Sequence, residues 1–258
     1  METPSVGFIG AGRVARIILG GWRVAGKASG PVTAYDPNVE AVKALRPLND
    51  QIKEAETPDS AAACDVVFLA VHPPVIQEAA SAIKGGLRKD AIVVSLAPKF
   101  TIDRLSALLG GFPRVARMIP NAPSLVGQGY NAVAYGSALG SEDKARLEKL
   151  IAPLGECPEV EERHLEAYAI LSGMGPTYFW PQIYALKTLG ESFGLNPDEA
   201  LNALDAMLAG TVAAAKYSGL SQEQVEDLIP IKPMAEEVSV LTKAFGEKLN
   251  LLMQKIRP

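Results

Sequence analysis

The stretch that decides the organisation of the chain is Val6-Gly7-Phe8-Ile9-Gly10-Ala11-Gly12-Arg13-Val14-Ala15. Its first four residues are apolar and predict a short buried strand, and the apolar residues after the glycines predict a helix. Between them lies a G-x-G-x-x-A turn, in which Gly12 lets backbone amides approach a pyrophosphate and Ala15 lets the helix pack closely on its strand. The order strand, glycine turn, helix predicts a dinucleotide site at the helix N-terminus. A glycine turn that binds no ligand is the alternative.

An acidic residue, Asp36, follows the second predicted strand at residues 32–35. It stands where an adenosine ribose hydroxyl is met in dinucleotide-binding proteins. A carboxylate there accepts a hydrogen bond from the 2′-hydroxyl and repels a 2′-phosphate, which favours NAD over NADP. Two alternatives stay open, because Arg13 is able to reach a 2′-phosphate and because an aspartate before Pro37 is also a common turn-former.

The composition is that of a globular protein with room for one large domain or two modest ones, since 48% of the 258 residues are hydrophobic. The net charge of −4 argues against a nucleic-acid surface, which normally needs a basic patch. No signal peptide and no membrane-spanning run is recognisable, so we expect a cytoplasmic protein with no membrane partner. Cys64 and Cys157 lack metal-ligand spacing, so we expect reduced thiols and no metal site.

Apolar runs alternate with helical patterns over residues 1–160, which predicts a doubly wound parallel sheet. Beyond the first two strands, we expect strands at residues 66–71, 91–96, 115–119, 132–135 and 157–160. In an open parallel sheet, ligands bind outside the carboxyl ends of the strands. The turns after three of these strands carry His72, Lys99 and Asn121, so we expect all three residues to face one crevice.

The alternation stops at residue 161, and residues 161–258 have a helical pattern that predicts a second, all-α domain. We expect helices at residues 162–171, 176–193 and 197–217, with Pro181 bending the start of the second. Leucines and alanines make the last two helices too apolar to lie alone in water, which favours burial in a dimer interface.

Three longer motifs accompany the glycine turn: LAVHP at residues 69–73, RMIPNAPSLVG at residues 117–127 and LSGMGPTY at residues 171–178. Together they resemble the pyrroline-5-carboxylate reductase family over nearly the whole chain. The resemblance implies a Rossmann domain at residues 1–160 that binds NAD(P)H and a helical dimerisation and substrate domain at residues 161–258. It also implies NAD(P)H-dependent reduction of a cyclic imine, as in the formation of L-proline.

The residues expected to contact the cofactor are Gly10, Ala11, Gly12, Arg13, Val14, Asp36, Ala70, Val71, His72 and Asn121. Those expected to contact the substrate are Ser172, Gly173, Gly175, Pro176, Lys232 and Glu236. The reaction needs few side chains, because the cofactor drives hydride transfer while the protein orients both reactants and excludes water.

Two departures from the family bear on the substrate. The family's carboxylate cradle reads S-P-G-G-T-T, and the matching residues 232–237 read KPMAEE, with glycines and hydroxyls replaced and two carboxylates added. These carboxylates repel an anion at close range, and Lys232 offsets part of that repulsion. The alternative is that the segment is simply the first turn of a helix. Lys99, where the family has glycine, is a weak candidate for a catalytic cation; a solvated lysine is the alternative.

The first hypothesis is therefore an imine reductase of this type, acting on pyrroline-5-carboxylate or on a related imine that is uncharged or carries an amine. A second is a non-catalytic nicotinamide-binding protein that keeps the fold and the dimer. A third is a hydroxyacid dehydrogenase, but the catalytic-lysine helix context of that group is not recognisable after Ser172.

Overall fold

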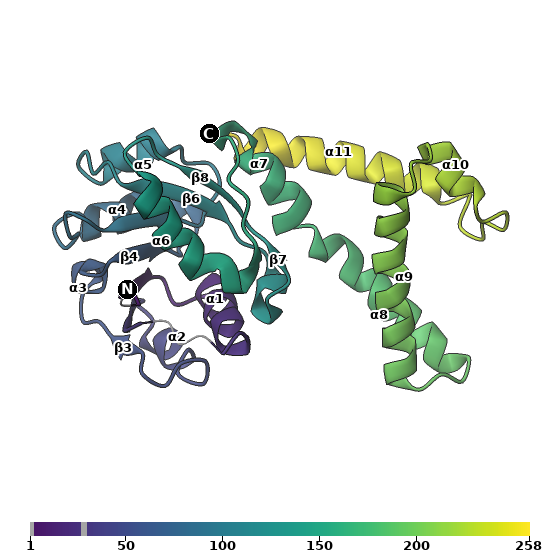
Figure 1. Ribbon diagram of the computed structural model, residues 1–258, viewed down its shortest axis with the longest axis horizontal. Helices are drawn as coiled ribbons and strands as arrows, with labels where there is room; N and C mark the ends of the chain where they lie inside the picture. Colours follow the sequence, from purple (N-terminus) through teal and green to yellow (C-terminus); the bar gives the residue numbers. More distant parts are fainter. Residues whose placement is uncertain (1–2, 27–29) are drawn as a thin grey trace. The chain divides into compact units, whose positions relative to one another are not determined.

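The structure, a computed structural model, describes residues 3–26 and 30–258, which form two compact units (Figure 1). The first unit comprises Met1–Met174 with Leu252–Pro258, and the second comprises Gly175–Leu251. The predicted domain boundary lies at residues 160/161, whereas the first compact unit continues to Met174. The reason is that Glu162 and Glu166 form ion pairs with a buried arginine of the sheet, which attaches their segment to the first unit.

A seven-stranded sheet with the order β3-β2-β1-β4-β5-β6-β8 is the frame of the first unit. Its strands are β1 (Val6–Ile9), β2 (Val32–Tyr35), β3 (Lys53–Glu54), β4 (Val66–Leu69), β5 (Ile92–Ser95), β6 (Val115–Ile119) and β8 (Ala132–Tyr135). All neighbours are parallel except β6 and β8. A second sheet pairs β7 (Gly129–Tyr130) with β9 (Gly155–Glu156). The predicted α/β fold class is confirmed, except that β8 runs antiparallel to its neighbour β6.

Two strand predictions need correction. The strand at residues 132–135 exists but runs antiparallel, because the connection after β6 holds no crossover helix and the chain returns along the neighbouring position. The strand predicted at residues 157–160 is reduced to one isolated bridge between Val133 and Glu159, and regular pairing is found earlier, in β9. Pro158, which has no N–H to donate, disfavours a continuous ladder there.

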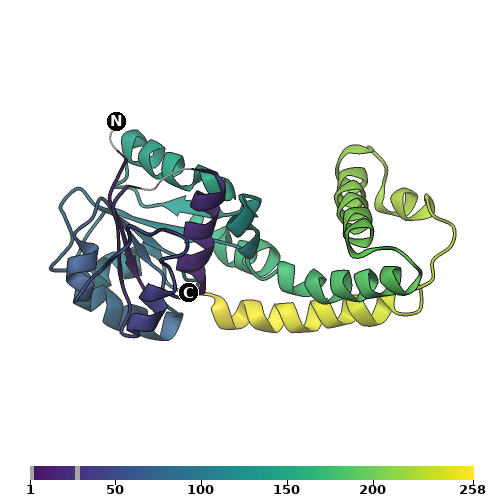
Figure 2. The same cartoon turned by 90° about the horizontal axis from the view of Figure 1, so that it is seen from below.

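Helices cover both faces of the sheet (Figures 1 and 2). They are α1 (Arg13–Val24), α2 (Val39–Lys43), α3 (Pro58–Ala62), α4 (Ile76–Ile83), α5 (Ile102–Leu108), α6 (Ser141–Ile151) and α7 (Leu165–Tyr168), with 3-10 turns η1 (Pro73–Val75), η2 (Ala122–Val126), η3 (Ala152–Leu154) and η4 (Glu162–His164). Alternate residues of β4 show the two cores: Val66 and Phe68 pack in the core with α1, and Val67 and Leu69 pack in the core with α4. Burial on both faces explains why the strands are continuous apolar runs.

Helix α1 lies against the turn η2, and two adjacent glycines make this contact possible. A Cβ at Gly21 would lie 2.3 Å from the backbone oxygen of Ser124, whereas the close contact of a Cβ at Gly20 would be with the far end of the Leu125 side chain, at 2.2 Å, and the nearest backbone atom would be at 3.7 Å. The contact connects the helix of the glycine turn with the loop after β6.

We expect Gly21→Ala to lower the free energy of unfolding by about 1–3 kcal/mol, because a backbone carbonyl cannot move aside without shifting η2. Gly20→Ala is the matched control and should change it by less than about 1 kcal/mol, since an exposed leucine changes rotamer at little cost. Urea unfolding followed by fluorescence measures both values. Equal losses for the two variants would contradict the proposed contact.

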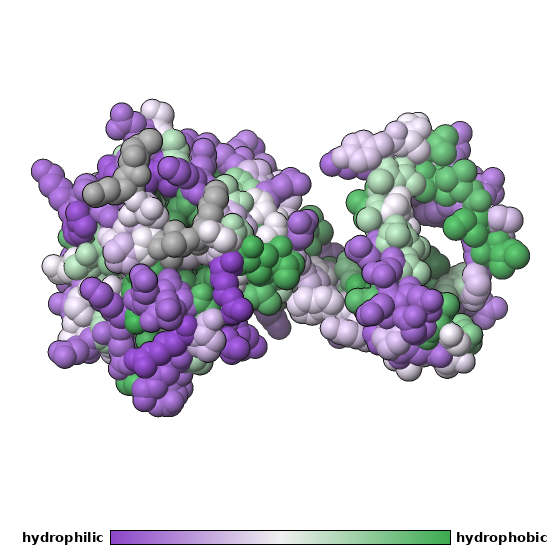
Figure 3. All heavy atoms as spheres, turned by 60° about the horizontal axis from the view of Figure 1, so that its bottom comes forward, coloured by the Kyte–Doolittle hydropathy of each residue, from purple (hydrophilic) through white to green (hydrophobic). Residues whose placement is uncertain are grey.

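The second unit consists of helices with little buried surface. They are α8 (Pro176–Ser192), α9 (Pro197–Tyr217), α10 (Gln222–Asp227) and α11 (Val238–Ile256), the last turns of α11 belonging to the first unit. Both predicted long helices exist, and the left-handed Gly194 and Gly219 follow their ends. No residue of α8, α10 or α11 is buried, and Phe179, Tyr184 and Val212 are more than half exposed. Hydrophobic residues, drawn in green, lie on the surface of this unit (Figure 3).

None of the helices within residues 3–26 and 30–258 combines the length and the apolar character needed to cross a bilayer.

Candidate active site

The glycine turn is built as the sequence predicts, between β1 and α1. Gly10 has a φ of +99°, and a Cβ there would lie 2.6 Å from the oxygen of Ala70, at the end of the neighbouring β4. Gly12 is the N-cap of α1, and a Cβ at Gly12 would meet open space. No side chain caps this helix and its first turn holds no acidic residue, so its free N–H groups face that space. The turn therefore fits a pyrophosphate.

Asp36 follows β2 and is bonded to the glycine turn. One carboxylate oxygen accepts a hydrogen bond from the Ala11 N–H (2.9 Å), and the other accepts one from the Asn38 N–H (2.9 Å). Each oxygen keeps a lone pair for a further donor such as a ribose hydroxyl. Asp36 thus orders the turn, and its place beside the turn is the one expected of a ribose ligand.

The loops that carry His72, Lys99 and Asn121 emerge from one edge of the sheet, because β4, β5 and β6 are adjacent and parallel. The His72 and Lys99 side chains are exposed, and Asn121 is buried. Ala70 and Val71 lie in the first of these loops and are half-buried. The three loops follow successive strands on the side of β1 where the nicotinamide half of a dinucleotide binds.

Asn121 joins the end of β6 to the predicted substrate segment. Its side-chain oxygen accepts a hydrogen bond from the Tyr130 N–H (3.2 Å), and its side-chain nitrogen donates one to the Ser172 carbonyl (3.3 Å). A Cβ at Gly173 would lie 3.2 Å from Ile119, so the two segments approach closely. Asn121 therefore fixes the segment that carries Ser172 and Gly173 against the carboxyl edge of the sheet.

The helix predicted at residues 162–171 is interrupted and ends in a π-helical turn, η5 (Ala169–Gly173), which follows η4 and α7. The Ser172 hydroxyl donates to the Tyr168 carbonyl (2.9 Å) within this turn. π-Turns are rare and occur frequently at functional sites. The periodicity of apolar residues does not distinguish such a turn from regular helix.

The remaining predicted substrate residues belong to the second unit. Gly175 and Pro176 start α8, where Gly175 is buried. Lys232 and Glu236 are exposed, and Glu236 lies in a turn at residues 233–237 that leads directly into α11. The second glutamate of the segment, Glu237, is exposed as well.

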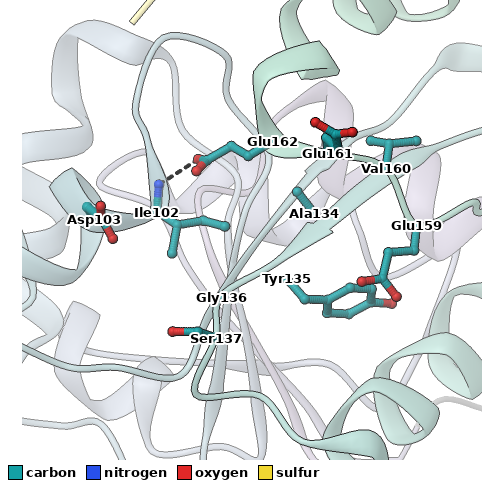
Figure 4. A pocket seen from close by; sticks show the side chains of 10 residues that line it. All are labelled: Ile102, Asp103, Ala134, Tyr135, Gly136, Ser137, Glu159, Val160, Glu161 and Glu162. Carbon is teal, nitrogen blue, oxygen red and sulfur yellow. Dashed lines mark hydrogen bonds between the residues drawn. The ribbon is translucent and has the colours of Figure 1, made fainter.

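A buried charge network is the feature that sequence reasoning missed. Arg117 of β6 is fully buried, and its guanidinium contacts Glu166 (2.5 Å) and Glu162 (3.0 Å). The Glu166 carboxylate also accepts a hydrogen bond from the Lys99 N–H (3.1 Å), and Glu162 accepts one from the Ile102 N–H (2.7 Å; Figure 4). The sequence did contain a signal for this network, because Arg117 lies inside an apolar strand and a buried charge needs partners of opposite charge.

The side chains in Figure 4 line a hollow of about 560 Å³ beside β8, and none of these lining residues is a predicted site residue. Its acids are largely paired, Glu159 with Lys144, Glu161 with Arg163 and Glu162 with Arg117. The described residues contain no group of three or more histidine, cysteine or acidic side chains able to hold a metal ion. Both cysteines are free; burial raises the pKa of the Cys64 thiol and raises the pKa of Cys157 to about 11.

Comparison with known proteins connects this geometry to a family. A family model described as NADP oxidoreductase coenzyme F420-dependent matches residues 5–99. The pyrroline-5-carboxylate reductase of Pisum sativum is 30% identical over 228 residues, which cover 88% of this chain and 82% of that protein. The chain belongs to the pyrroline-5-carboxylate reductase family. Human pyrroline-5-carboxylate reductase 2 is 36% identical over 197 residues, covering 74% of this chain and 61% of that protein.

Solved structures of the family share the fold. The pyrroline carboxylate reductase of Plasmodium falciparum, solved with NADP bound, superposes with a TM-score of 0.73 at 22% identity and covers 99% of this chain and 95% of its own. The enzyme of Coxiella burnetii has a TM-score of 0.69 at 24% identity, with the same coverage. As a member of this family, the chain is an NAD(P)-dependent oxidoreductase.

Proposed function

We propose that this protein reduces a cyclic imine with NAD(P)H, as a divergent reductase of the pyrroline-5-carboxylate type. The observation that carries the proposal is the hydrogen bond from the Asn121 side chain to the Ser172 carbonyl. It holds a predicted substrate segment at the sheet edge where the nicotinamide half of the cofactor is expected, so a flat imine has a place next to it.

The cofactor is proposed to bind along the carboxyl edge of the sheet. Gly10, Ala11 and Gly12 would hold the pyrophosphate at the N-terminus of α1, with Arg13 and Val14 in the first helical turn beside it. Ala70, Val71, His72 and Asn121 would contact the rest of the cofactor. When bound, the reduced nicotinamide supplies the hydride that the imine carbon accepts.

Ser172 and Gly173 are proposed to contact the substrate. The same role is proposed for Gly175, Pro176, Lys232 and Glu236. Residues 161–258 are also proposed to form a homodimer, because α8 and α11 have no buried residue and carry half-exposed aromatic and aliphatic side chains that need a further surface to cover them. Free, protonated thiols at Cys64 and Cys157 fit a reducing compartment such as the cytosol.

The decisive experiment measures oxidation of NADH and NADPH by the purified protein with pyrroline-5-carboxylate and, separately, with uncharged 1-pyrroline. Turnover of either imine supports the proposed reaction, and the ratio of the two rates identifies the substrate class. Tight binding of reduced cofactor with no oxidation by either imine would contradict the proposal and favour a binding protein.

The cofactor preference is proposed to be NAD, on the basis of Asp36. Asp36→Ala should weaken NADH binding roughly tenfold more than NADPH binding, because loss of the Ala11 hydrogen bond affects both cofactors and only NADH also loses a hydrogen bond from its 2′-hydroxyl. Asp36→Asn is the control, since an amide oxygen still accepts the Ala11 N–H while the charge that repels a 2′-phosphate is gone; NADPH binding should improve. Titration of cofactor fluorescence gives the dissociation constants. Equal losses of both cofactors in the alanine variant would contradict this role.

A further inference from the structure

Lys99 has a backbone conformation that side chains rarely adopt. Its φ is +81°, and among the described residues it is the one position other than glycine with a positive φ. A long side chain in this region is disfavoured by contact between Cβ and the backbone. Such strain is kept in a protein when the surroundings impose it, and it occurs preferentially at functional sites.

The buried network imposes this conformation on Lys99. The Lys99 N–H donates to Glu166, whose side chain is 4% exposed and pairs with the fully buried Arg117. Three residues later, the Ile102 N–H donates to Glu162, the second partner of the same arginine. Both ends of this short loop are thus bonded to glutamates that pair with one buried arginine, and the loop cannot relax without breaking these hydrogen bonds.

The Lys99 side chain, in contrast, is available to a ligand. Lys99 is exposed, and its ammonium group forms no ion pair with any acid in the described part of the chain. The loop follows β5, two strands from β1, which corresponds to roughly 10 Å across the sheet. The glycine turn at β1 is the phosphate end of the cofactor site, so Lys99 lies toward the nicotinamide and the substrate.

We propose that Lys99 is a specificity-determining residue that binds the carboxylate of an anionic imine substrate. The inference rests on the proposed function and extends it, because it selects a substrate class. Residues 232–237 offer two exposed glutamates against one exposed lysine, Lys232, and no glycine or hydroxyl, so that segment is ill-suited to hold an anion by itself. A lysine held at the carboxyl edge of the sheet supplies the missing charge, at the cost of backbone strain that glycine would avoid.

The test compares Lys99→Gly, Lys99→Arg and a matched control, Lys89→Gly, with the wild type. Lys89 is an exposed lysine before the opposite, amino end of the same strand β5. Each protein is assayed with pyrroline-5-carboxylate and with 1-pyrroline, and the dissociation constants of NADH and NADPH are measured alongside the melting temperature.

We expect Lys99→Gly to raise KM for pyrroline-5-carboxylate by roughly 10- to 100-fold, as removal of a charged hydrogen-bond partner does, and to leave 1-pyrroline kinetics unchanged. Its melting temperature should rise by roughly 2–4 °C, because glycine relieves the strain. Lys99→Arg should retain most of the carboxylate preference. Lys89→Gly should leave both KM values unchanged.

Several results would overturn the inference. If Lys99→Gly lowers activity equally with the two imines, or with neither, Lys99 does not bind the substrate carboxylate. If the variant instead binds both NADH and NADPH more weakly, the lysine charge interacts with a cofactor phosphate. An unchanged melting temperature in Lys99→Gly would contradict the claim that the backbone of Lys99 is strained. A wild-type protein that oxidises neither cofactor with either imine would instead overturn the proposed function, and the assignment of Lys99 with it.

Discussion

Gly12→Val should weaken the binding of both NADH and NADPH by roughly 100-fold or more while the protein stays folded. Folding should be little affected, because a Cβ at Gly12 has no protein atom within 4 Å. Cofactor binding should be lost, because that Cβ would enter the space where a pyrophosphate approaches the N-terminus of α1. Cofactor binding is measured by fluorescence titration, and folding by circular dichroism and thermal melting. Imine reduction should be lost in parallel.

Gly140→Val is a close control for this variant. Gly140 is the N-cap of α6 and, like Gly12, has an extended backbone; a Cβ at Gly140 would likewise meet no protein atom within 4 Å. Both substitutions should reduce stability by about 1 kcal/mol or less, as expected for an apolar residue at an N-cap. Cofactor binding should be unaffected in Gly140→Val. Unchanged binding in Gly12→Val would show that the glycine turn does not hold the cofactor.

Arg117→Met should reduce the free energy of unfolding by about 3–5 kcal/mol. The substitution preserves much of the apolar volume but leaves the buried Glu166 carboxylate with the Lys99 N–H as its remaining hydrogen-bond donor among the described residues. An uncompensated buried charge is far more costly than a missing ion pair at the surface. Urea unfolding of the wild type and the variant measures the loss.

Two further variants test whether the unpaired buried charge causes this loss of stability. Arg117→Met combined with Glu166→Leu should recover most of the lost stability, because no buried charge is then unpaired. Arg114→Met removes an arginine just before the same strand, whose pair with Asp143 is about one fifth exposed on both sides, and should cost about 1 kcal/mol. A small loss in Arg117→Met, equal to that of Arg114→Met, would mean that burial of the network contributes little.

Much of the frame could be predicted from residues close together in the chain. The glycine turn, the strand before it and the acid after β2 follow from local spacing, and continuous apolar runs indicated the buried strands. Helix ends at Gly194 and Gly219 were predictable because a left-handed residue after a helix is usually glycine. The resemblance through longer motifs led to the family that comparison with known proteins confirms.

The direction of β8 and the absence of a regular strand at residues 157–160 were not predictable in this way. A run of apolar residues indicates burial, but the direction of a strand depends on the path of its connection and on the free edge it meets. The unit boundary at Met174 likewise depends on ion pairs between residues far apart in the sequence, Arg117 with Glu162 and Glu166.

The glycine turn, the alternation of strands and helices, and the family could all be recognised in the order of the residues. Three features became visible only in the folded chain: the Asp36 carboxylate orders the glycine turn, Asn121 binds the Ser172 carbonyl, and Lys99 has a strained backbone. The physical reason is the range of the interactions. Backbone conformation and periodic burial follow from neighbouring residues, whereas a buried ion pair or a strained loop exists only when distant segments supply its partners.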